Sequence, residues 1–136
     1  MVDFATLLRE ADVLSIHIHL TDENRGLIDR EALAAMKKTA VLLNTSRGAV
    51  IDQDALLEAL ETGRLAGAGL DVIEGEWDDN LHEHPLIRYA RTNQNLVISP
   101  HIGGVTYESQ KMTLEYTVLK LRSYLEYARK GLMIYP

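Results

Sequence analysis

Polar and charged side chains with acid–base potential accompany four apolar, β-branched segments of the sequence. The segments cover residues 12–19, 39–45, 65–73 and 95–99. The side chains are His17 and His19 within the first segment, Arg47 after the second, Asp71 and Glu76 at the end of the third, and His101 after the fourth. Groups of these types can bind an anion and exchange a proton near neutral pH.

The four apolar segments are predicted to be strands of one sheet. The second and the fourth are nearly continuous in apolar residues, which is typical of parallel strands buried on both faces. Helices are expected between the strands, at 29–38 and at 52–62. Asp29 and Asp52 are suited to cap these two helices, and Gly63 is suited to end the second one.

The rest of the chain is expected to hold two further helices and one long loop. A short helix is predicted at 4–9, and a long final helix begins after Thr106, a suitable capping residue. The polar stretch 77–94 contains Pro85 and is interpreted as a surface loop with room for a helical turn. The final helix carries an apolar stripe that is predicted to face a core; it consists of Leu114, Val118, Leu121, Leu125 and Ala128.

This alternation of helices and strands indicates an α/β fold, a partial Rossmann-like (doubly wound), mainly parallel sheet with flanking helices. In open sheets of this class, ligands bind outside the carboxyl ends of the strands. The polar side chains at those ends are therefore expected to converge on one edge of the sheet.

Composition narrows the class of protein. The chain has 136 residues, of which 46% are apolar, and a formal net charge of −6. Its scattered lysines and arginines disfavour nucleic acid binding, and the absence of cysteine excludes disulfides and thiol catalysis. With no leader and no apolar run long enough to span a bilayer, the expectation is a soluble cytoplasmic protein without a membrane partner.

Four ordered motifs cover nearly the whole chain: 11–28 (ADVLSIHIHLTDENRGLI), 42–60 (LLNTSRGAVIDQDALLEAL), 65–76 (LAGAGLDVIEGE) and 99–109 (SPHIGGVTYES). Together they closely resemble the D-isomer-specific 2-hydroxyacid dehydrogenases, such as the phosphoglycerate, glyoxylate and hydroxypyruvate dehydrogenases. The resemblance implies an oxidoreductase that reversibly transfers a hydride between a nicotinamide and a small 2-hydroxy or 2-keto acid. The implied cofactor is NAD, with NADP left open.

The resemblance also assigns roles to individual residues. Arg47 would bind the substrate carboxylate, His101 would be the general acid and base, and Glu76 would hydrogen-bond the other nitrogen of that imidazole. The cofactor would be lined by Thr45, Ser46, Arg47, Asp71, His101, Ile102, Gly103, Gly104 and His17. A departure from the family lies beside Glu76, where Trp77 stands in place of the usual Pro.

The chain lacks the family's G-x-G-x-x-G phosphate-binding loop. It is therefore interpreted as a C-terminal portion, with the first βαβ unit missing. Residues 1–105 would form the C-terminal half of the NAD-binding domain, and residues 106–136 a helix leading back towards an absent substrate domain. Isolated, the chain is expected to bind NAD weakly and to be inactive. An uncovered strand edge predicts a homo-oligomer, most simply a dimer, formed either by pairing of strand edges or by swapping of the long C-terminal helix.

Several alternatives remain open at this point. Arg47 could be a solvated turn residue, Asp71 a loop carboxylate, and the segment around His101 only a turn at the end of a strand. Two His-x-His pairs, at 17–19 and 82–84, could suggest a metal, but no set of partner ligands accompanies them and no metal is predicted. The chain could also be a non-catalytic binding, scaffolding or regulatory fragment that retains the dehydrogenase half-fold.

Overall fold

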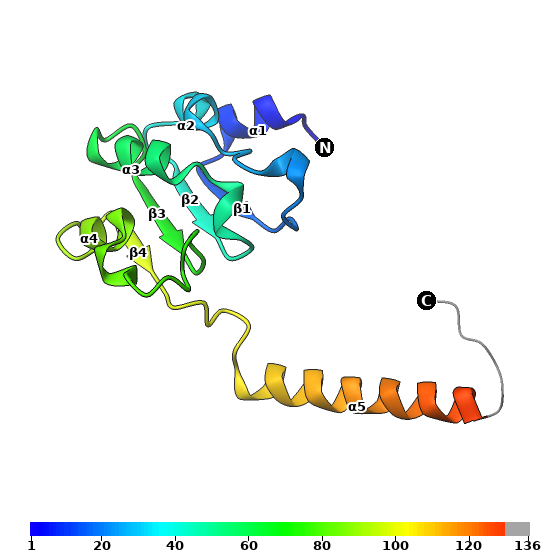
Figure 1. The fold of residues 1–136 in the computed structure, drawn as a ribbon. Coiled ribbons are helices and arrows are strands. Elements are labelled where there is room, and N and C mark those ends of the chain that lie inside the picture. The colour runs from blue at the N-terminus through cyan, green and yellow to red at the C-terminus, as the bar shows by residue number, and fades with distance from the viewer. Residues whose placement is uncertain (130–136) are drawn as a thin grey trace. The chain divides into compact units, whose positions relative to one another are not determined.

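The computed structural model of the chain describes residues 1–129, which belong to two compact units, Met1–His101 and Ile102–Pro136 (Figure 1). The first unit contains a four-stranded parallel sheet with the strand order β1-β2-β3-β4. The strands are β1 (Val13–Ile16), β2 (Val41–Asn44), β3 (Gly67–Leu70) and β4 (Leu96–Ile98). All four lie inside the segments predicted from the sequence, which confirms the α/β, Rossmann-like fold class.

Helices pack side by side along one face of this sheet (Figure 1). They are α1 (Phe4–Glu10), α2 (Arg30–Ala35), α3 (Gln53–Glu61) and α4 (Pro85–Ala90). The predicted caps are confirmed, because the carboxylates of Asp29 and Asp52 accept hydrogen bonds from the amides of Ala32 and Ala55, at 2.8 and 3.0 Å. Gly63 follows α3 with a φ of 67°, a left-handed conformation that suits glycine.

The strands bury only one face beneath these helices. The row Leu14, Leu42, Ala68 and Leu96 runs across the sheet in register and belongs to the hydrophobic core. On the opposite face, the side chains of Val13 and Val97 are 59% and 65% exposed. The expectation that both faces are buried is therefore not met within residues 1–101.

The stretch 77–94 contains more structure than the sequence indicated. A 3₁₀ turn, η3 (Leu81–Glu83), leads into α4, whose first residue is Pro85. Nδ1 of His84 accepts a hydrogen bond from the Leu86 amide at 3.2 Å, and Leu86 is buried in the core. A six-residue helix with one buried side chain is too short to give a recognisable apolar period, which is why the sequence favoured a loop.

The second unit contains the long helix α5 (Tyr107–Arg129). Oγ1 of Thr106 accepts a hydrogen bond from the Ser109 amide at 3.1 Å, as predicted for a cap. Within its own unit, this helix buries none of its described residues, so the apolar stripe that begins at Leu114 faces no core there. The functional boundary at residue 105 stays a prediction. Over residues 1–129, no helix is both long and apolar enough to cross a membrane.

Candidate active site

The carboxyl ends of the four parallel strands form one edge of the sheet, where the predicted site residues begin. His17 follows β1, residues 45–47 follow β2, Asp71 follows β3 directly, and His101 lies three residues after β4. The amide of Asp71 donates a hydrogen bond to the Asn44 carbonyl at 2.9 Å, and the amide of Ser99 donates one to the Leu70 carbonyl at 2.9 Å. The ladder thus continues just past the strands and fixes the starting points of these loops.

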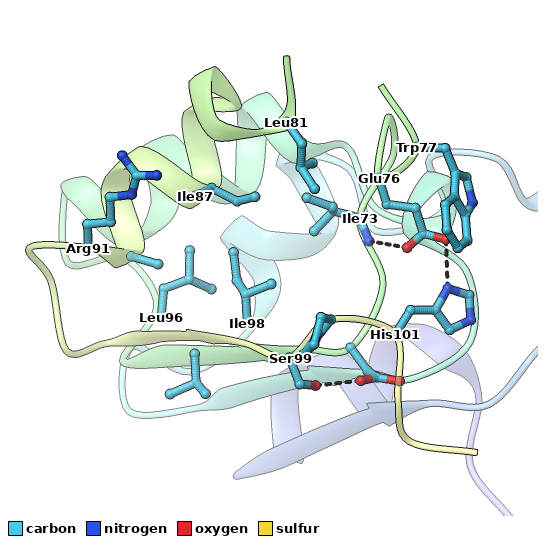
Figure 2. Close-up of a pocket in the computed structure, with 14 residues that line it drawn as sticks. Ile73, Glu76, Trp77, Leu81, Ile87, Arg91, Leu96, Ile98, Ser99 and His101 are labelled. Carbon is cyan, nitrogen blue, oxygen red and sulfur yellow. Dashed lines mark hydrogen bonds and ion pairs between the residues drawn. The ribbon is translucent and has the colours of Figure 1, made fainter. Parts of the chain in front are cut away.

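His101 and Glu76 form the closest pair at this edge. Nδ1 of the imidazole lies 2.7 Å from Oε1 of the carboxylate, although 25 residues separate the two in the sequence (Figure 2). An ionised carboxylate can only accept a hydrogen bond, so a neutral imidazole in this contact carries its proton on Nδ1 and has a lone pair on Nε2, at the other edge of the ring. The side chains of both residues are partly buried.

Tight backbone turns present both members of this pair. The amide of Asp78 donates a hydrogen bond to the Gly75 carbonyl at 3.0 Å, closing a turn with Glu76 and Trp77 at its centre. Gly75 has a φ of 76°, which a side chain would disfavour. His101 itself has a φ of 54°, so a non-glycine residue is held in a sparsely populated conformation at the site.

Asp71 is a buried carboxylate beside this pair. Only 6% of its surface is exposed, and Oγ of Ser99 donates a hydrogen bond to Oδ1 of Asp71. A buried carboxylate is retained only where hydrogen bonds compensate its lost hydration, so Ser99 helps to keep this group in place. The Asp71 carboxylate, a hydrogen-bond acceptor, therefore lies at the same edge of the sheet as the imidazole of His101.

Arg47 stands on a separate loop after β2. Its side chain is exposed, and Nη1 donates a hydrogen bond to the carbonyl of Ser46 at 2.6 Å. The loop is shaped by Asn44, whose amide nitrogen donates to the Arg47 carbonyl at 2.9 Å. Oδ1 of Asn44 accepts hydrogen bonds from the amide and the hydroxyl of Ser46, at 3.0 and 2.9 Å. Asn44 is fully buried and fixes the backbone that carries the guanidinium.

The arginine loop packs directly against the loop that leads to Glu76. A Cβ added at Gly48 would lie 2.2 Å from the carbonyl carbon of Ile73 and 2.3 Å from the amide nitrogen of Glu74. Such distances are below any real contact, so only glycine permits this approach. The backbone next to Arg47 and the backbone that carries Glu76 are thereby held in mutual contact.

A hollow of about 640 Å³ opens between α4 and β4, beside the pair formed by His101 and Glu76 (Figure 2). Asp71, Glu76, Ser99 and His101 stand among its lining residues. The rest of the lining is largely apolar: Ile73, Trp77, Leu81, Ile87, Ala90, Arg91, Leu96, Val97, Ile98 and Pro100. Of the predicted site residues, Asp71, Glu76 and His101 therefore share one hollow, whereas Thr45, Ser46 and Arg47 are not among its lining.

The remaining predicted cofactor residues lie elsewhere. His17 is exposed after β1, and its Nε2 lies 2.8 Å from Oγ of Ser15. Ile102, Gly103 and Gly104 belong to the second unit. Among the described residues, no cluster of three or more histidine or carboxylate side chains could hold a metal ion.

Comparison with known proteins identifies the protein family that has these residues at the end of the sheet. Residues 1–103 match the family model of the D-isomer specific 2-hydroxyacid dehydrogenase NAD binding domain. The chain belongs to this family. The matched region contains the whole first unit, including Arg47, Glu76 and His101.

Individual relatives of this dehydrogenase family agree with the assignment. The chain is 42% identical over 120 residues to a glyoxylate reductase of Thermococcus litoralis, covering 88% of this chain and 34% of the relative. It is 43% identical over 109 residues to the D-3-phosphoglycerate dehydrogenase of Bacillus subtilis, covering 79% of this chain and 19% of the relative. The chain thus spans about a third or less of the length of these two curated dehydrogenases.

Solved dehydrogenase structures have the same fold. The NAD-complexed D-isomer specific 2-hydroxyacid dehydrogenase of Lactobacillus delbrueckii ssp. bulgaricus superposes with a TM-score of 0.84 at 32% identity. That match covers 98% of this chain and 41% of the solved one. The partial Rossmann-like sheet predicted from the sequence is therefore part of a larger dehydrogenase architecture in this relative.

Three residues that help to build the site, Asn44, Gly48 and Ser99, were given no role from the sequence. They act through loop geometry and through hydrogen bonds that a local sequence pattern does not predict. The available signals were a polar residue at the end of an apolar strand, as at Asn44, and a glycine directly after a charged residue, as at Gly48. Trp77, noted in the sequence as a departure from the family's usual Pro, is 83% exposed.

Proposed function

We propose that this chain supplies the acid–base histidine, its orienting carboxylate and the substrate-binding arginine of a D-2-hydroxyacid dehydrogenase. The observation that carries the proposal is the 2.7 Å contact between Nδ1 of His101 and Oε1 of Glu76 at the carboxyl edge of the sheet. A histidine oriented by a carboxylate, with its second nitrogen left as a proton acceptor, is an arrangement suited to general acid–base catalysis.

The proposed reaction is the interconversion of a 2-hydroxy acid and a 2-keto acid. In the oxidative direction, Nε2 of His101 accepts the proton of the substrate hydroxyl, and in the reductive direction the same atom returns it to the ketone oxygen. Glu76 keeps the proton on Nδ1 and stabilises the imidazolium that forms when Nε2 is protonated. Arg47 binds the substrate carboxylate, because its planar guanidinium can offer two parallel N–H donors.

The residues at this edge fit a nicotinamide cofactor. When bound, NAD accepts or gives up the hydride of the reaction. The buried carboxylate of Asp71, directly at the end of β3, is an acceptor suited to a carboxamide nitrogen. Thr45, Ser46 and His17 offer further polar groups on the neighbouring loops. Ile102, Gly103 and Gly104 are proposed as further cofactor-binding residues.

The 136-residue chain by itself is proposed to bind NADH weakly and to lack turnover. No G-x-G-x-x-G sequence is present in it to hold a pyrophosphate at a helix N-terminus. Hydride transfer also requires the two reacting carbons to be held at roughly 3–3.5 Å. Calorimetric titration of the chain with NADH measures binding. A turnover assay with glyoxylate, hydroxypyruvate and pyruvate measures activity, and clear turnover would contradict this part of the proposal.

The dehydrogenase role is tested directly by a graft. Residues 1–103 of this chain replace the aligned segment of the Thermococcus litoralis glyoxylate reductase, to which the chain is 42% identical. The proposal predicts that the graft reduces glyoxylate with NADH, because the chain brings a complete acid–base pair and a carboxylate-binding arginine. A folded graft that binds NADH but does not reduce glyoxylate would overturn the proposal.

Self-association is proposed as a second property of the chain. The sheet face opposite the helices exposes Val13 and Val97, and α5 buries none of its described side chains within its own unit. Exposed apolar faces of this kind favour association with a second copy. The proposed assembly is a homodimer.

A further inference from the structure

Trp77 is the only tryptophan of the chain, and its indole lies beside the imidazole of His101. The centroids of the two rings are 6.2 Å apart, with an angle of 38° between the ring planes. A separation of about 4.5–7 Å is the range in which aromatic side chains attract each other. Figure 2 shows both rings next to the carboxylate of Glu76.

Burial does not explain the presence of this tryptophan. Its side chain is 83% exposed, so it contributes little to the hydrophobic core. Single exposed apolar residues are common on protein surfaces, and exposure alone assigns Trp77 no role. The ring contact with His101 is the observation that distinguishes it.

The turn at residues 75–78 explains why the indole and the carboxylate reach the same histidine. The hydrogen bond from the Asp78 amide to the Gly75 carbonyl, at 3.0 Å, places Glu76 and Trp77 at the two central positions of one turn. One turn thus provides both a hydrogen-bond acceptor for Nδ1 and an aromatic surface beside the imidazole. Gly75, the first residue of the turn, has a φ of 76°, a conformation that glycine adopts readily.

We propose that Trp77 is a positioning residue that restrains the imidazole of His101 so that Nδ1 stays on Glu76. The imidazole is only partly buried and stands on a backbone with a φ of 54°, so it needs side-chain contacts to hold one orientation. The carboxylate fixes one edge of the ring, and the indole limits its rotation away from that carboxylate. The ionisable groups that line the hollow together with the imidazole are Asp71, Glu76 and Arg91.

The catalytic value of this contact rests on the proposed function, but the contact itself does not. It can therefore be measured on the 136-residue chain without cofactor or turnover. Failure of the graft to reduce glyoxylate would leave the ring contact untouched, whereas failure of the spectroscopic test below would leave the dehydrogenase proposal standing.

The test is nuclear magnetic resonance of the histidine side chains in the chain and in Trp77→Ala and Trp77→Phe, with the His101 signals assigned by their loss in His101→Gln. We expect the carbon-bound protons of the His101 ring to show a ring-current shift that is lost in Trp77→Ala and partly kept in Trp77→Phe. We also expect the imidazole ¹⁵N shifts to report a single tautomer, with the proton on Nδ1, that becomes a mixture in Trp77→Ala.

Two controls separate positioning from a change of fold. His82→Gln removes another histidine, whose nearest ionic partner is Glu83, and should leave the fluorescence of Trp77 unchanged, whereas His101→Gln should alter it. The amide spectrum of β1 to β3 should be the same in Trp77→Ala as in the unaltered chain. If the tautomer of His101 is the same with and without the indole, the proposal is wrong, even where the ring-current shift is lost.

Discussion

Nδ1 of His101 lies 2.7 Å from Oε1 of Glu76, which joins the loop after β4 to the loop after β3. His101 has a positive φ, a backbone conformation that non-glycine residues rarely adopt, whereas the positive φ of Gly75, next to Glu76, is one that glycine adopts readily. A strained conformation such as that of His101 is kept where the surrounding structure holds it in place. The parallel sheet does so here, because the ladder continues past β3 and β4 through the amides of Asp71 and Ser99.

Gly48→Ala tests the close approach of the arginine loop to the segment before Glu76. The new Cβ would meet the backbone of Ile73 at 2.2 Å, so one of the two loops must move. Overpacking of this kind costs about 1–3 kcal/mol in the free energy of unfolding, measured by urea denaturation followed by circular dichroism. Gly104→Ala, where a Cβ would meet nothing within 4 Å, serves as the control and should be nearly neutral.

Asn44→Ala tests the hydrogen-bonded base of the same loop. The substitution removes a fully buried side chain and leaves the Ser46 amide and the Arg47 carbonyl without their partner in a part-buried position. The net contribution of one hydrogen bond is about 0.5–1.5 kcal/mol, so urea denaturation should show a clear loss of stability. Asn80→Ala removes an exposed asparagine that makes no side-chain cap bond; an equal loss there would contradict the role given to Asn44.

Arg47→Lys tests the proposed carboxylate-binding group, in the graft onto the Thermococcus litoralis reductase. Lysine keeps the charge but loses the paired N–H donors that match a carboxylate. A charge-assisted hydrogen bond contributes about 1.5–3 kcal/mol, so kcat/KM for glyoxylate should fall roughly 10- to 150-fold. Arg88→Lys, at an exposed position on α4, should leave it unchanged. An equal kcat/KM for both variants would show that Arg47 does not bind the substrate carboxylate.

Self-association through the uncovered sheet face is measured by sedimentation of the 136-residue chain over a range of concentrations. The proportion of dimer should rise with concentration and should fall when Val13→Lys and Val97→Lys are combined, since charges oppose burial of that face. Leu27→Lys changes an exposed residue in a loop and should not affect association. A monomer at all concentrations would contradict the proposal.

The four strands and the helices α2 and α3 could be predicted because their signals are local. Apolar runs indicated the strands, and Asp29 and Asp52 indicated the starts of α2 and α3 as side-chain caps. The motifs also indicated Glu76 as the partner of His101, although the neighbouring Glu74 is also acidic. In the structure Glu74 pairs with Arg25 at 2.8 Å instead.

The structural features that the sequence did not predict depend on contacts between segments that are distant in the chain. The role of Gly48 arises from its approach to Ile73, 25 positions away, and nothing in the residues around it indicates that neighbour. The one-sided cover of the sheet was also missed, because an apolar residue such as Val97 gives the same signal whether or not a layer covers it. Helix α4 was predicted only as room for a helical turn within a loop, because Pro85 and a single buried leucine give little helical signal.

The most direct test of the account is the glyoxylate reductase activity of the graft with His101→Gln, compared with His82→Gln. Removing a general acid–base group typically costs about 10²- to 10⁴-fold in rate, so kcat at saturating NADH should fall by this amount for His101→Gln and stay unchanged for His82→Gln. If His101→Gln retains the kcat of the unaltered graft, His101 is not the proton-transferring residue and the proposed site is wrong.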